Sequence, residues 1–411
     1  MPDHILAIDQ GTTSTRAIVF DLSATSVASA QVELTQHFPQ PGWVEHDPIE
    51  IAEAAVSVAN QAISRANLSP DDIAAIGITN QRETTVVWER ETGRPVANAI
   101  VWQDRRTAEI CRDILKTDHA ENIRKITGLV VDPYFSATKL MWLLTTIPDG
   151  QARAESGELC FGTIDSWLLW HLTAGQVHAT DASNASRTML LNLHDLQWDP
   201  EMLELFNIPE QMLPEVKSTA DDFGDTDRSI FRTDIPITAM AGDQHAALYG
   251  QACLKNGQIK CTYGTGAFVL ANKGTMVPTQ SSGLGDAGLL ATLGFQVGTK
   301  KTYAIEGSVF VTGATIQWLR EGLGVISNAP ETVDMALSAG TNDGVYFVPA
   351  LVGLGAPHWQ PEATGLITGL TRGTDRNHIV RAALESTAYQ VKDVVGAMEA
   401  GSQKSNQSLR A

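Results

Sequence analysis

The sequence is poor in basic residues, which limits the partners that it can have. It contains 29 lysines and arginines against 47 acidic residues, so the formal net charge is −18, and the isoelectric point lies near 4.9. Nucleic acids and anionic membranes both select positively charged protein surfaces. We therefore expect no nucleic-acid partner, although backbone donors and a metal ion can still hold an anionic nucleotide.

Cysteine is scarce, and its spacing excludes several kinds of site. Cys111, Cys160, Cys253 and Cys261 form no C-x-x-C pair and no cluster with histidine at zinc-ligand spacing. They are typical of buried thiols in a reducing compartment. No basic leader opens the chain, and no apolar run is long enough to cross a bilayer. The sequence predicts a cytoplasmic protein without a membrane span.

The order of the sequence patterns predicts α/β architecture. The 411 residues are enough for two or three domains, and a hydrophobic content of 43% supplies large cores. Strand-like runs such as HILAID, RAIVFD and AAIGIT alternate with helical patterns. Asp47, Pro48 and Glu50 predict a helix start with a capping box. A second set of patterns begins near residue 255, so we expect domains over residues 1–254 and 255–411.

A phosphate-binding loop of the G-x-x-x-x-G-K-[ST] type is absent, but the stretch AIDQGTTSTR offers another arrangement. Gly11 lets the chain turn sharply and approach an anion closely. The turn amides, the neighbouring hydroxyl groups and one guanidinium are donors for phosphate oxygens. These side chains belong to Thr12, Thr13, Ser14 and Arg16. Asp9 can hold a hydrated Mg²⁺. A hairpin without a ligand explains this stretch, taken alone, equally well.

The same arrangement recurs in the second half of the chain. IKCTYGTGAFVLAN predicts a strand, a turn at Gly264, Thr265 and Gly266, and a second strand. Two such hairpins, one in each domain, could hold the phosphates of a nucleotide from two sides. The plainer interpretation is a common hairpin turn.

Further polar side chains follow predicted strands or lie in conspicuous motifs. They are Arg82, Glu83, Trp102, Tyr134, Asp243 and Gln244. Ligands of α/β sheets gather at the carboxyl ends of strands. Each residue also has a plainer interpretation: a surface ion pair for Arg82 and Glu83, packing aromatics for Trp102 and Tyr134. For Asp243 the plainer interpretation is a helix N-cap.

The motifs, taken in order from residue 4 to about residue 400, resemble the FGGY carbohydrate kinases of the actin-like ATPase superfamily. They are AIDQGTTSTR, GITNQRETTVVWE, AIVWQDRR, VDPYFSATK, DASNASRTML, AGDQHAALYGQ, TYGTGAF, ALVGLGAPHW and GLITGLTRGTDRNHIVRAALES. Within the family the chain resembles the members that phosphorylate glycerol. The resemblance implies two ribonuclease H-like domains flanking a cleft. It also implies ATP-dependent conversion of glycerol to sn-glycerol 3-phosphate with release of ADP, Mg²⁺ as cofactor, and a homodimer or homotetramer.

The resemblance also assigns roles to residues of this chain. The residues implied for glycerol are Arg82, Glu83, Trp102, Tyr134, Asp243 and Gln244, and Asp243 would be the catalytic base. The residues implied for ATP are Thr12, Thr13, Ser14, Arg16, Gly264, Thr265, Gly266, Gly307 and Gln317. Asp9 and Asp243 would hold Mg²⁺, mainly through water.

The chain departs from the family pattern at its C-terminal end. Family members continue through a D-G-G segment and further elements that supply much of the adenine pocket, so the resemblance implies an incomplete second domain. We expect a helix around residues 378–399 to lose neighbours, leaving Val391, Val394 and Val395 poorly covered. Two alternatives stay open, the first of them because of this departure. One is a non-catalytic protein that binds glycerol or nucleotide, and the other is a kinase for another polyol or a ketose.

Overall fold

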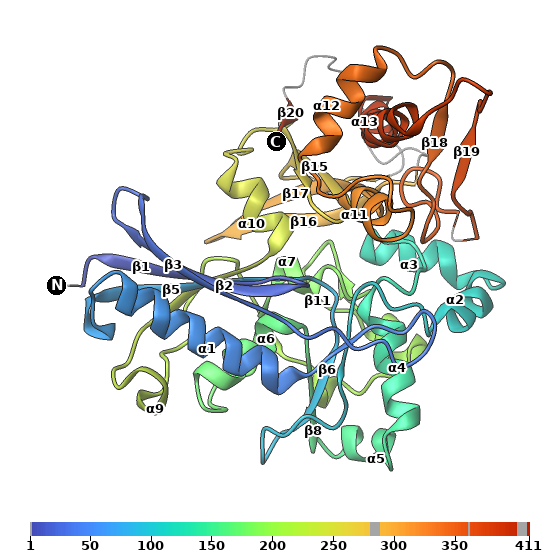
Figure 1. The fold of residues 1–411 in the computed structure, drawn as a ribbon. Coiled ribbons are helices and arrows are strands. Elements are labelled where there is room, and N and C mark those ends of the chain that lie inside the picture. Colours follow the sequence, from blue (N-terminus) through green and yellow to red (C-terminus); the bar gives the residue numbers. More distant parts are fainter. Residues whose placement is uncertain (1, 280–287, 361, 401–408) are drawn as a thin grey trace. The chain divides into compact units, whose positions relative to one another are not determined.

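The computed structural model describes residues 2–279, 288–360, 362–400 and 409–411. The chain forms two compact units (Figure 1). Unit 1 comprises Met1–Ala246 and Thr292–Thr302, and unit 2 comprises Ala247–Ala291 and Tyr303–Ala411. Among the residues described, the main sheet of each half of the chain has five strands. In the same part of the chain, no helix combines the length and the apolar character needed to span a membrane.

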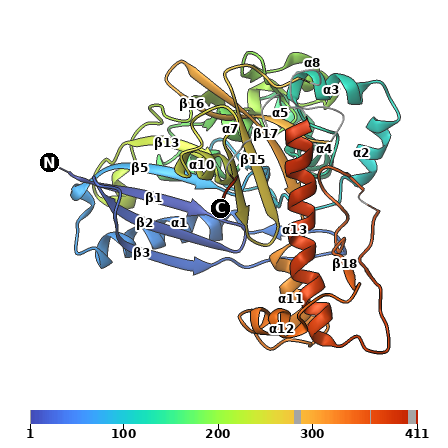
Figure 2. The ribbon, with the colours of Figure 1, turned by 90° about the horizontal axis from the view of Figure 1, so that it is seen from above.

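The main sheet of unit 1 has the strand order β13-β5-β1-β2-β3. Its strands are β1 (His4–Gln10), β2 (Ser14–Asp21), β3 (Ser26–Glu33), β5 (Ile73–Asn80) and β13 (Ile237–Gly242). β1, β2 and β3 are antiparallel neighbours, whereas β5 runs parallel to both β1 and β13. Figure 2 shows β5, β1, β2 and β3 side by side. The carboxyl ends of β1, β5 and β13 therefore meet at one edge of the sheet.

Helix α1 (Pro48–Arg65) covers one face of this sheet, over β2 and β3. Asp47 caps the helix, because its carboxylate accepts the Ile49 N–H at 2.8 Å. The predicted capping box is wrong, since Glu50 accepts from the backbone and hydroxyl of Thr35 instead. The predicted apolar face is confirmed, and its buried residues include Ile51, Ala55, Val58 and Ala62.

The remaining elements of unit 1 connect the strands of the main sheet. The paired short strands are β4 (Glu45–His46) with β7 (Ala99–Ile100), β6 (Val86–Glu89) with β8 (Leu159–Gly162), β9 (Ala179–Asp181) with β12 (Glu215–Lys217), and β10 (Leu191–Asn192) with β11 (Gln197–Trp198). The helices are α2 (Ala108–Leu115), α3 (His119–Thr127), α4 (Ser136–Thr146), α5 (Gly150–Glu155), α6 (Ile164–Leu172), α7 (Ala182–Ala185), α8 (Pro200–Leu205) and α9 (Arg228–Phe231), with single 3₁₀ turns at Pro70–Asp72 and Glu210–Met212. α10 (Asp243–Gly250) follows β13 directly.

The second sheet has the strand order β16-β17-β15-β14-β20. Its strands are β14 (Ile259–Tyr263), β15 (Ala267–Gly274), β16 (Leu290–Val297), β17 (Lys300–Val309) and β20 (Leu409–Arg410). β14 and β15 form an antiparallel hairpin, β17 adds to β15, and β20 runs parallel to β14. The first sheet has the same pattern of strand pairing: β1 and β2 form an antiparallel hairpin, β3 adds to β2, and β5 runs parallel to β1. The prediction that one hairpin arrangement occurs in both halves is confirmed.

Helix α13 (Arg376–Ala400) packs against β15 (Figure 2). The expectation that its valines are poorly covered is wrong for Val391 and Val394, which are 5% and 0% exposed. Val395 is half-buried. A Cβ atom on Gly307 in β17 would collide with Val394 Cγ1, so the glycine lets the helix approach the sheet closely. The other elements here are α11 (Gly313–Glu321), α12 (Glu331–Ala339), β18 (Tyr346–Val348) and β19 (Leu366–Thr368).

Candidate functional site

The hairpin of β1 and β2 brings a carboxylate and a guanidinium to one face of the sheet. Asp9 lies directly opposite Arg16 in the antiparallel register, so both side chains point to the same side. Burial, together with the negative charge of Asp243, raises the pKa of the Asp9 carboxyl to about 6, while Arg16 opposes the shift. The carboxylates of Asp9 and Asp243 therefore lie close enough to repel each other.

The turn between β1 and β2 is closed by a hydrogen bond from Gly11 N–H to the Ser14 carbonyl at 2.9 Å. Gly11 does not adopt a left-handed φ, contrary to the expectation that the turn depends on glycine's freedom. A Cβ atom there would instead lie 3.2 Å from the Ser14 carbonyl oxygen, which is tight. Thr12 Oγ1 accepts the Trp102 indole N–H at 2.9 Å. The Thr12 hydroxyl proton is therefore left to donate to another acceptor.

Arg82 is the centre of a buried cluster of polar side chains at the end of β5. Its Nε lies 3.3 Å from Asp243 Oδ1 and 3.9 Å from Glu83 Oε1. Its terminal nitrogen donates to Tyr134 Oη at 3.3 Å. Arg82 is 3% exposed and Glu83 is 1% exposed, which rules out the surface ion pair. The Trp102 ring meets the Tyr134 ring edge-on, with the ring centroids 5.7 Å apart.

Asp243 stands at the end of β13 with its carboxylate partly open to solvent. Its side chain is 37% exposed. Oδ1 accepts the Gln244 backbone N–H at 2.7 Å, and Oδ2 accepts the Gln244 side-chain amide at 2.9 Å. A Cβ atom on Gly242 would lie 2.7 Å from Arg82 Cγ and Cδ, so glycine is needed for Arg82 to reach this carboxylate. Asp243 is thus fixed in direction while one side remains reachable.

Glu83 has a strained backbone, with φ near 61°. Thr84 N–H donates to the Arg82 carbonyl at 2.7 Å, which makes a three-residue turn with Glu83 at its centre. The Glu83 carbonyl accepts hydrogen bonds from the hydroxyls of Thr85 and Ser136. Strain of this kind persists only where the surrounding contacts enforce it, and it is concentrated at functional sites.

Two buried cations beside this cluster were not predicted from the sequence. Arg187 is 0% exposed, and its Nε donates to Glu83 Oε1 at 2.7 Å. Lys139 Nζ donates to the Tyr134 carbonyl at 2.6 Å, and burial lowers the pKa of this ammonium to about 8. The sequence signal for these two residues is their place in the motifs DASNASRTML and VDPYFSATK, and neither motif shows that the cation is buried.

The other predicted site residues lie in unit 2. The turn from Gly264 to Gly266 is closed by a hydrogen bond between the Gly264 N–H and the Gly266 carbonyl at 2.8 Å. The N–H groups of Thr312, Gly313 and Ala314 at the start of α11 donate to carbonyls of this turn. Of the predicted residues, Gly264, Thr265 and, on α11, Gln317 are exposed, whereas Gly266 is buried. Gly307 lies elsewhere, buried in β17 under α13.

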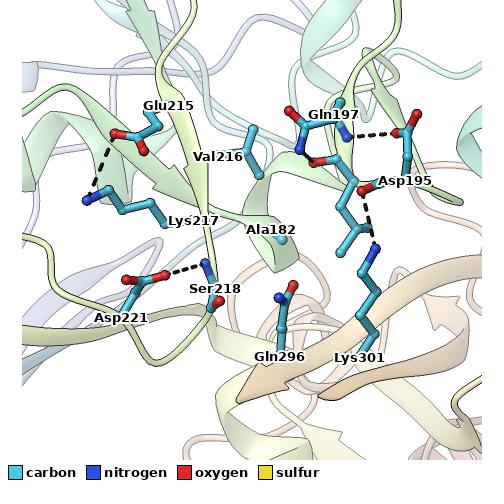
Figure 3. Close-up of a pocket in the computed structure, with 11 residues that line it drawn as sticks. Ala182, Asp195, Gln197, Glu215, Val216, Lys217, Ser218, Asp221, Gln296 and Lys301 are labelled. Atoms are coloured by element: carbon cyan, nitrogen blue, oxygen red, sulfur yellow. Dashed lines mark hydrogen bonds and ion pairs between the residues drawn. The ribbon is translucent and has the colours of Figure 1, made fainter. Parts of the chain in front are cut away.

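A pocket of unit 1 contains none of the predicted site residues (Figure 3). It has a volume of roughly 240 Å³ and is lined mainly by polar side chains, among them Lys217, Gln296 and Lys301. Lys217 Nζ donates to the Asp222 carbonyl at 2.7 Å, and Lys301 Nζ donates to the Asp195 carbonyl at 3.2 Å. Both ammonium groups are thus engaged by backbone, and the pocket presents no set of donors aimed at one ligand.

The chemistry of the cluster around Arg82 suits a small neutral polyol. Arg82 supplies fixed donors, Glu83 and Asp243 supply acceptors, and Trp102 and Tyr134 supply an apolar wall. Asp243 is also the reachable carboxylate, so it can take a proton from a bound hydroxyl.

Comparison with known proteins finds matches over almost the whole chain. The model of the FGGY family of carbohydrate kinases, N-terminal domain, matches residues 4–250, and that of the C-terminal domain matches residues 259–411. The chain is 55% identical to a glycerol kinase of Caldanaerobacter subterraneus subsp. tengcongensis, over all of this chain and 82% of that protein. It is 54% identical to glycerol kinase 2 of Thermotoga maritima, over 99% of this chain and 81% of that protein.

Solved structures give the same result for the fold. The structure of Plasmodium falciparum glycerol kinase with ADP matches with a TM-score of 0.88 and 37% identity, covering 99% of this chain and 81% of that one. A gluconate kinase of Lactobacillus acidophilus matches with a TM-score of 0.82 over 96% of this chain and 78% of that one, and at 23% identity it bears on the fold alone. The predicted α/β fold with two domains of the actin-like type is confirmed.

Proposed function

The chain belongs to the FGGY family of carbohydrate kinases, and on this premise we propose that it transfers the γ-phosphoryl group of ATP to glycerol. The products are sn-glycerol 3-phosphate and ADP. The observation that carries the proposal is the buried cluster in which Arg82 contacts both Tyr134 and Asp243. That cluster supplies the donors, acceptors and apolar wall that a triol requires, in a chain more than half identical to glycerol kinases.

We assign the glycerol hydroxyl groups to the side chains of this cluster. Arg82 donates to glycerol oxygen atoms, while Glu83 and Asp243 accept from hydroxyl protons. Trp102 packs against the carbon edge of glycerol, and the Tyr134 hydroxyl can donate or accept a hydrogen bond. Gln244, whose side-chain amide donates a hydrogen bond to Asp243, is the last residue that we assign to glycerol binding.

Asp243 is the proposed catalytic base. As the γ-phosphoryl group moves in line, Asp243 accepts the proton of the attacking hydroxyl. The transition state of phosphoryl transfer is loose, so positioning and charge stabilisation matter more than base strength. The fixed direction of the carboxylate, set by Arg82 and by the Gln244 N–H, supports this role. A general base of this kind contributes about 10²–10⁴-fold to the rate.

ATP is proposed to be held by the two hairpin turns and by residues of α11 and β17. The residues are Thr12, Thr13, Ser14, Arg16, Gly264, Thr265, Gly266, Gly307 and Gln317. In unit 1 the Thr12 hydroxyl supports the assignment, because it accepts from Trp102 and keeps its proton for a phosphate oxygen. For Gly307 the structure gives a separate reason for glycine, namely the approach of α13.

Mg²⁺ is the proposed cofactor, held by Asp9 and Asp243. In the described part of the chain, no three or more histidine, cysteine, aspartate or glutamate side chains are grouped to hold a metal ion. Mg²⁺ needs few protein ligands, because it keeps several waters and binds substrate phosphates. The raised pKa of Asp9 near Asp243 fits such a site, since a divalent cation would offset the repulsion between the carboxylates. When bound, the ion would neutralise phosphate charge.

Three further proposals concern the whole protein. We place the domain boundary near residue 254, which limited proteolysis would test. We place the enzyme in the cytoplasm, where a reducing environment suits its four buried, unpaired cysteines. Assembly into a homodimer or homotetramer is testable by light scattering.

A substrate panel tests the proposed function directly. With ATP and Mg²⁺, we expect glycerol to be turned over with a kcat/KM at least about 100-fold above that of xylulose or gluconate. The reason is that a site built to pair hydroxyl groups rejects molecules that leave its buried polar groups unmatched. A higher kcat/KM for a ketose or an aldonate would overturn the assignment of the substrate.

A further inference from the structure

We propose that Arg187 is a positioning residue for glycerol binding, which acts by holding the Glu83 carboxylate ionised and in one orientation. The inference rests on the proposed function, because it concerns the same site. Arg187 belongs to the motif DASNASRTML, none of whose residues is among those proposed to bind glycerol or ATP. Its side chain contacts Glu83 and the ring of Tyr134, two residues that are proposed to bind glycerol.

The placement of Arg187 is fixed on both sides. It follows α7, where its N–H donates to the Asn184 carbonyl at 2.9 Å. The carbonyl of the next residue, Thr188, accepts the N–H of Ala137, at the start of α4, at 2.8 Å. The guanidinium carbon lies 5.2 Å from the centre of the Phe135 ring and 5.7 Å from that of Tyr134. Arg187 therefore enters the cluster as a rigid cation from a segment remote in sequence.

The charge of Glu83 requires such a cation. The carboxylate is 1% exposed, and burying an ionised carboxylate without a hydrogen-bonded partner is strongly unfavourable. Arg187 Nε donates to Glu83 Oε1 at 2.7 Å, whereas Arg82 Nε lies 3.9 Å from the same oxygen. Arg82 is closer to Asp243, at 3.3 Å. At the guanidinium Nε atoms, Arg187 is thus the closer arginine to Glu83 Oε1, and Arg82 Nε lies closer to Asp243 than to Glu83.

Because the backbone of Glu83 is strained, contacts to its carboxylate are needed to keep the side chain in one orientation. With φ near 61°, the residue sits in a conformation that its own chain does not favour. Hydroxyl groups hold its carbonyl, but the direction of its side chain depends on contacts to the carboxylate. Without Arg187 we expect the carboxylate to protonate or to turn away, so that it no longer accepts a hydrogen bond from a glycerol hydroxyl.

A double-mutant cycle separates this role from a merely structural one. The proteins are the parent, Arg187→Met, Glu83→Gln and the double variant, each measured by calorimetric binding of glycerol and by steady-state kinetics. We expect Arg187→Met to raise the KM and the Kd for glycerol about 10- to 100-fold, the range for losing a hydrogen bond to a charged group. The KM for ATP should change less than about threefold, because Arg187 is proposed to act only through Glu83.

The decisive readout is the effect of Arg187→Met in the Glu83→Gln background. If Arg187 acts through Glu83, the second substitution adds less than about threefold to the glycerol Kd. A full additional 10-fold or larger loss would overturn the proposal, as would a folded Arg187→Met protein with parental glycerol affinity. Arg187→Lys keeps the charge but loses the planar fork, and an intermediate loss of affinity is expected. It carries the test if Arg187→Met does not fold.

A matched control removes another ion-paired arginine of unit 1. Arg153 lies 3.0 Å from Glu89 and also pairs with Glu158, outside the cluster around Arg82. Arg153→Met should leave the glycerol KM within about twofold of the parent. Failure of the parent to phosphorylate glycerol would sink the proposed function. The coupling of Arg187 to Glu83 would then still be tested by the thermal stabilities of the same four proteins, where additive losses would contradict it.

Discussion

Asp9 is the single residue whose titration gives the clearest prediction. Its pKa in the folded protein is about 6, against a reference of 3.8, mainly because it is buried and also because Asp243 is near. A raised carboxyl pKa means that the folded state holds the proton more tightly than the unfolded state. This contribution to stability is present in full below about pH 4 and is lost as the pH rises through 6.

Asp9→Asn removes the free-energy cost of keeping an ionised carboxylate buried near Asp243. Above pH 6 and without nucleotide or metal, we expect the variant to be more stable than the parent by about 1 kcal/mol, a value discounted for partial exposure. The difference should fade as the pH drops towards 4. Thermal unfolding at a series of pH values measures it, and a variant less stable than the parent at pH 7.5 would contradict it. Asp21→Asn is a control for which the change in stability should have the opposite sign. Hydrogen bonds from Ser23 and Thr25 lower the pKa of Asp21, so its carboxylate stabilises the folded protein and its removal should destabilise it.

At this scale the sequence predicted the residues that are proposed to face substrate and missed those behind them. Arg82 and Asp243 each follow a strand at the same sheet edge, a position that local pattern reveals. Arg187 and Lys139 are charged residues that are fully buried; Arg187 bonds to Glu83, far away in the chain, and Lys139 bonds to the Tyr134 carbonyl, five residues before it. Charged side chains are mostly exposed, so a sequence pattern alone favours the wrong location for them.

At the scale of elements, local signals predicted what an element is but not all of its partners. The apolar face of α1 and its Asp47 cap follow from spacing alone. Glu50 was assigned to the same helix start, yet it bonds to Thr35, because the loop before the helix offers it a backbone and a hydroxyl donor. The close packing of α13 was missed for a similar reason, since it depends on Gly307 in a different element.

That packing is testable by adding one methyl group. Gly307→Ala would bring a Cβ atom into Val394, and we expect a loss of about 1–3 kcal/mol in the free energy of unfolding. Val394→Ala makes room, so the double variant should lose less than the sum of the two single variants. Chemical denaturation of the four proteins measures this coupling. Strict additivity would mean that α13 does not rest on β17 at this position.

At the scale of the whole molecule, the repeated topology is the feature that the sequence predicted best. Two hairpins with glycine and threonine turns predicted two similar sheets, and β1, β2, β3 and β5 indeed share their connectivity with β14, β15, β17 and β20. The sequence patterns did not predict β16 as a separate strand. Its hairpin with β17 includes Thr292–Thr302, a segment that belongs to unit 1. A local sequence pattern does not show to which unit such a segment belongs.

The most direct test of the whole account is the formation of sn-glycerol 3-phosphate by the purified chain with ATP and Mg²⁺, beside Asp243→Asn. The substitution keeps the size of the side chain but removes the carboxylate proposed as base. We expect turnover in the parent and a fall in kcat of about 10²–10⁴-fold in the variant, with glycerol still bound. Equal rates in the two proteins, or glycerol binding by the parent without any product, would contradict the account.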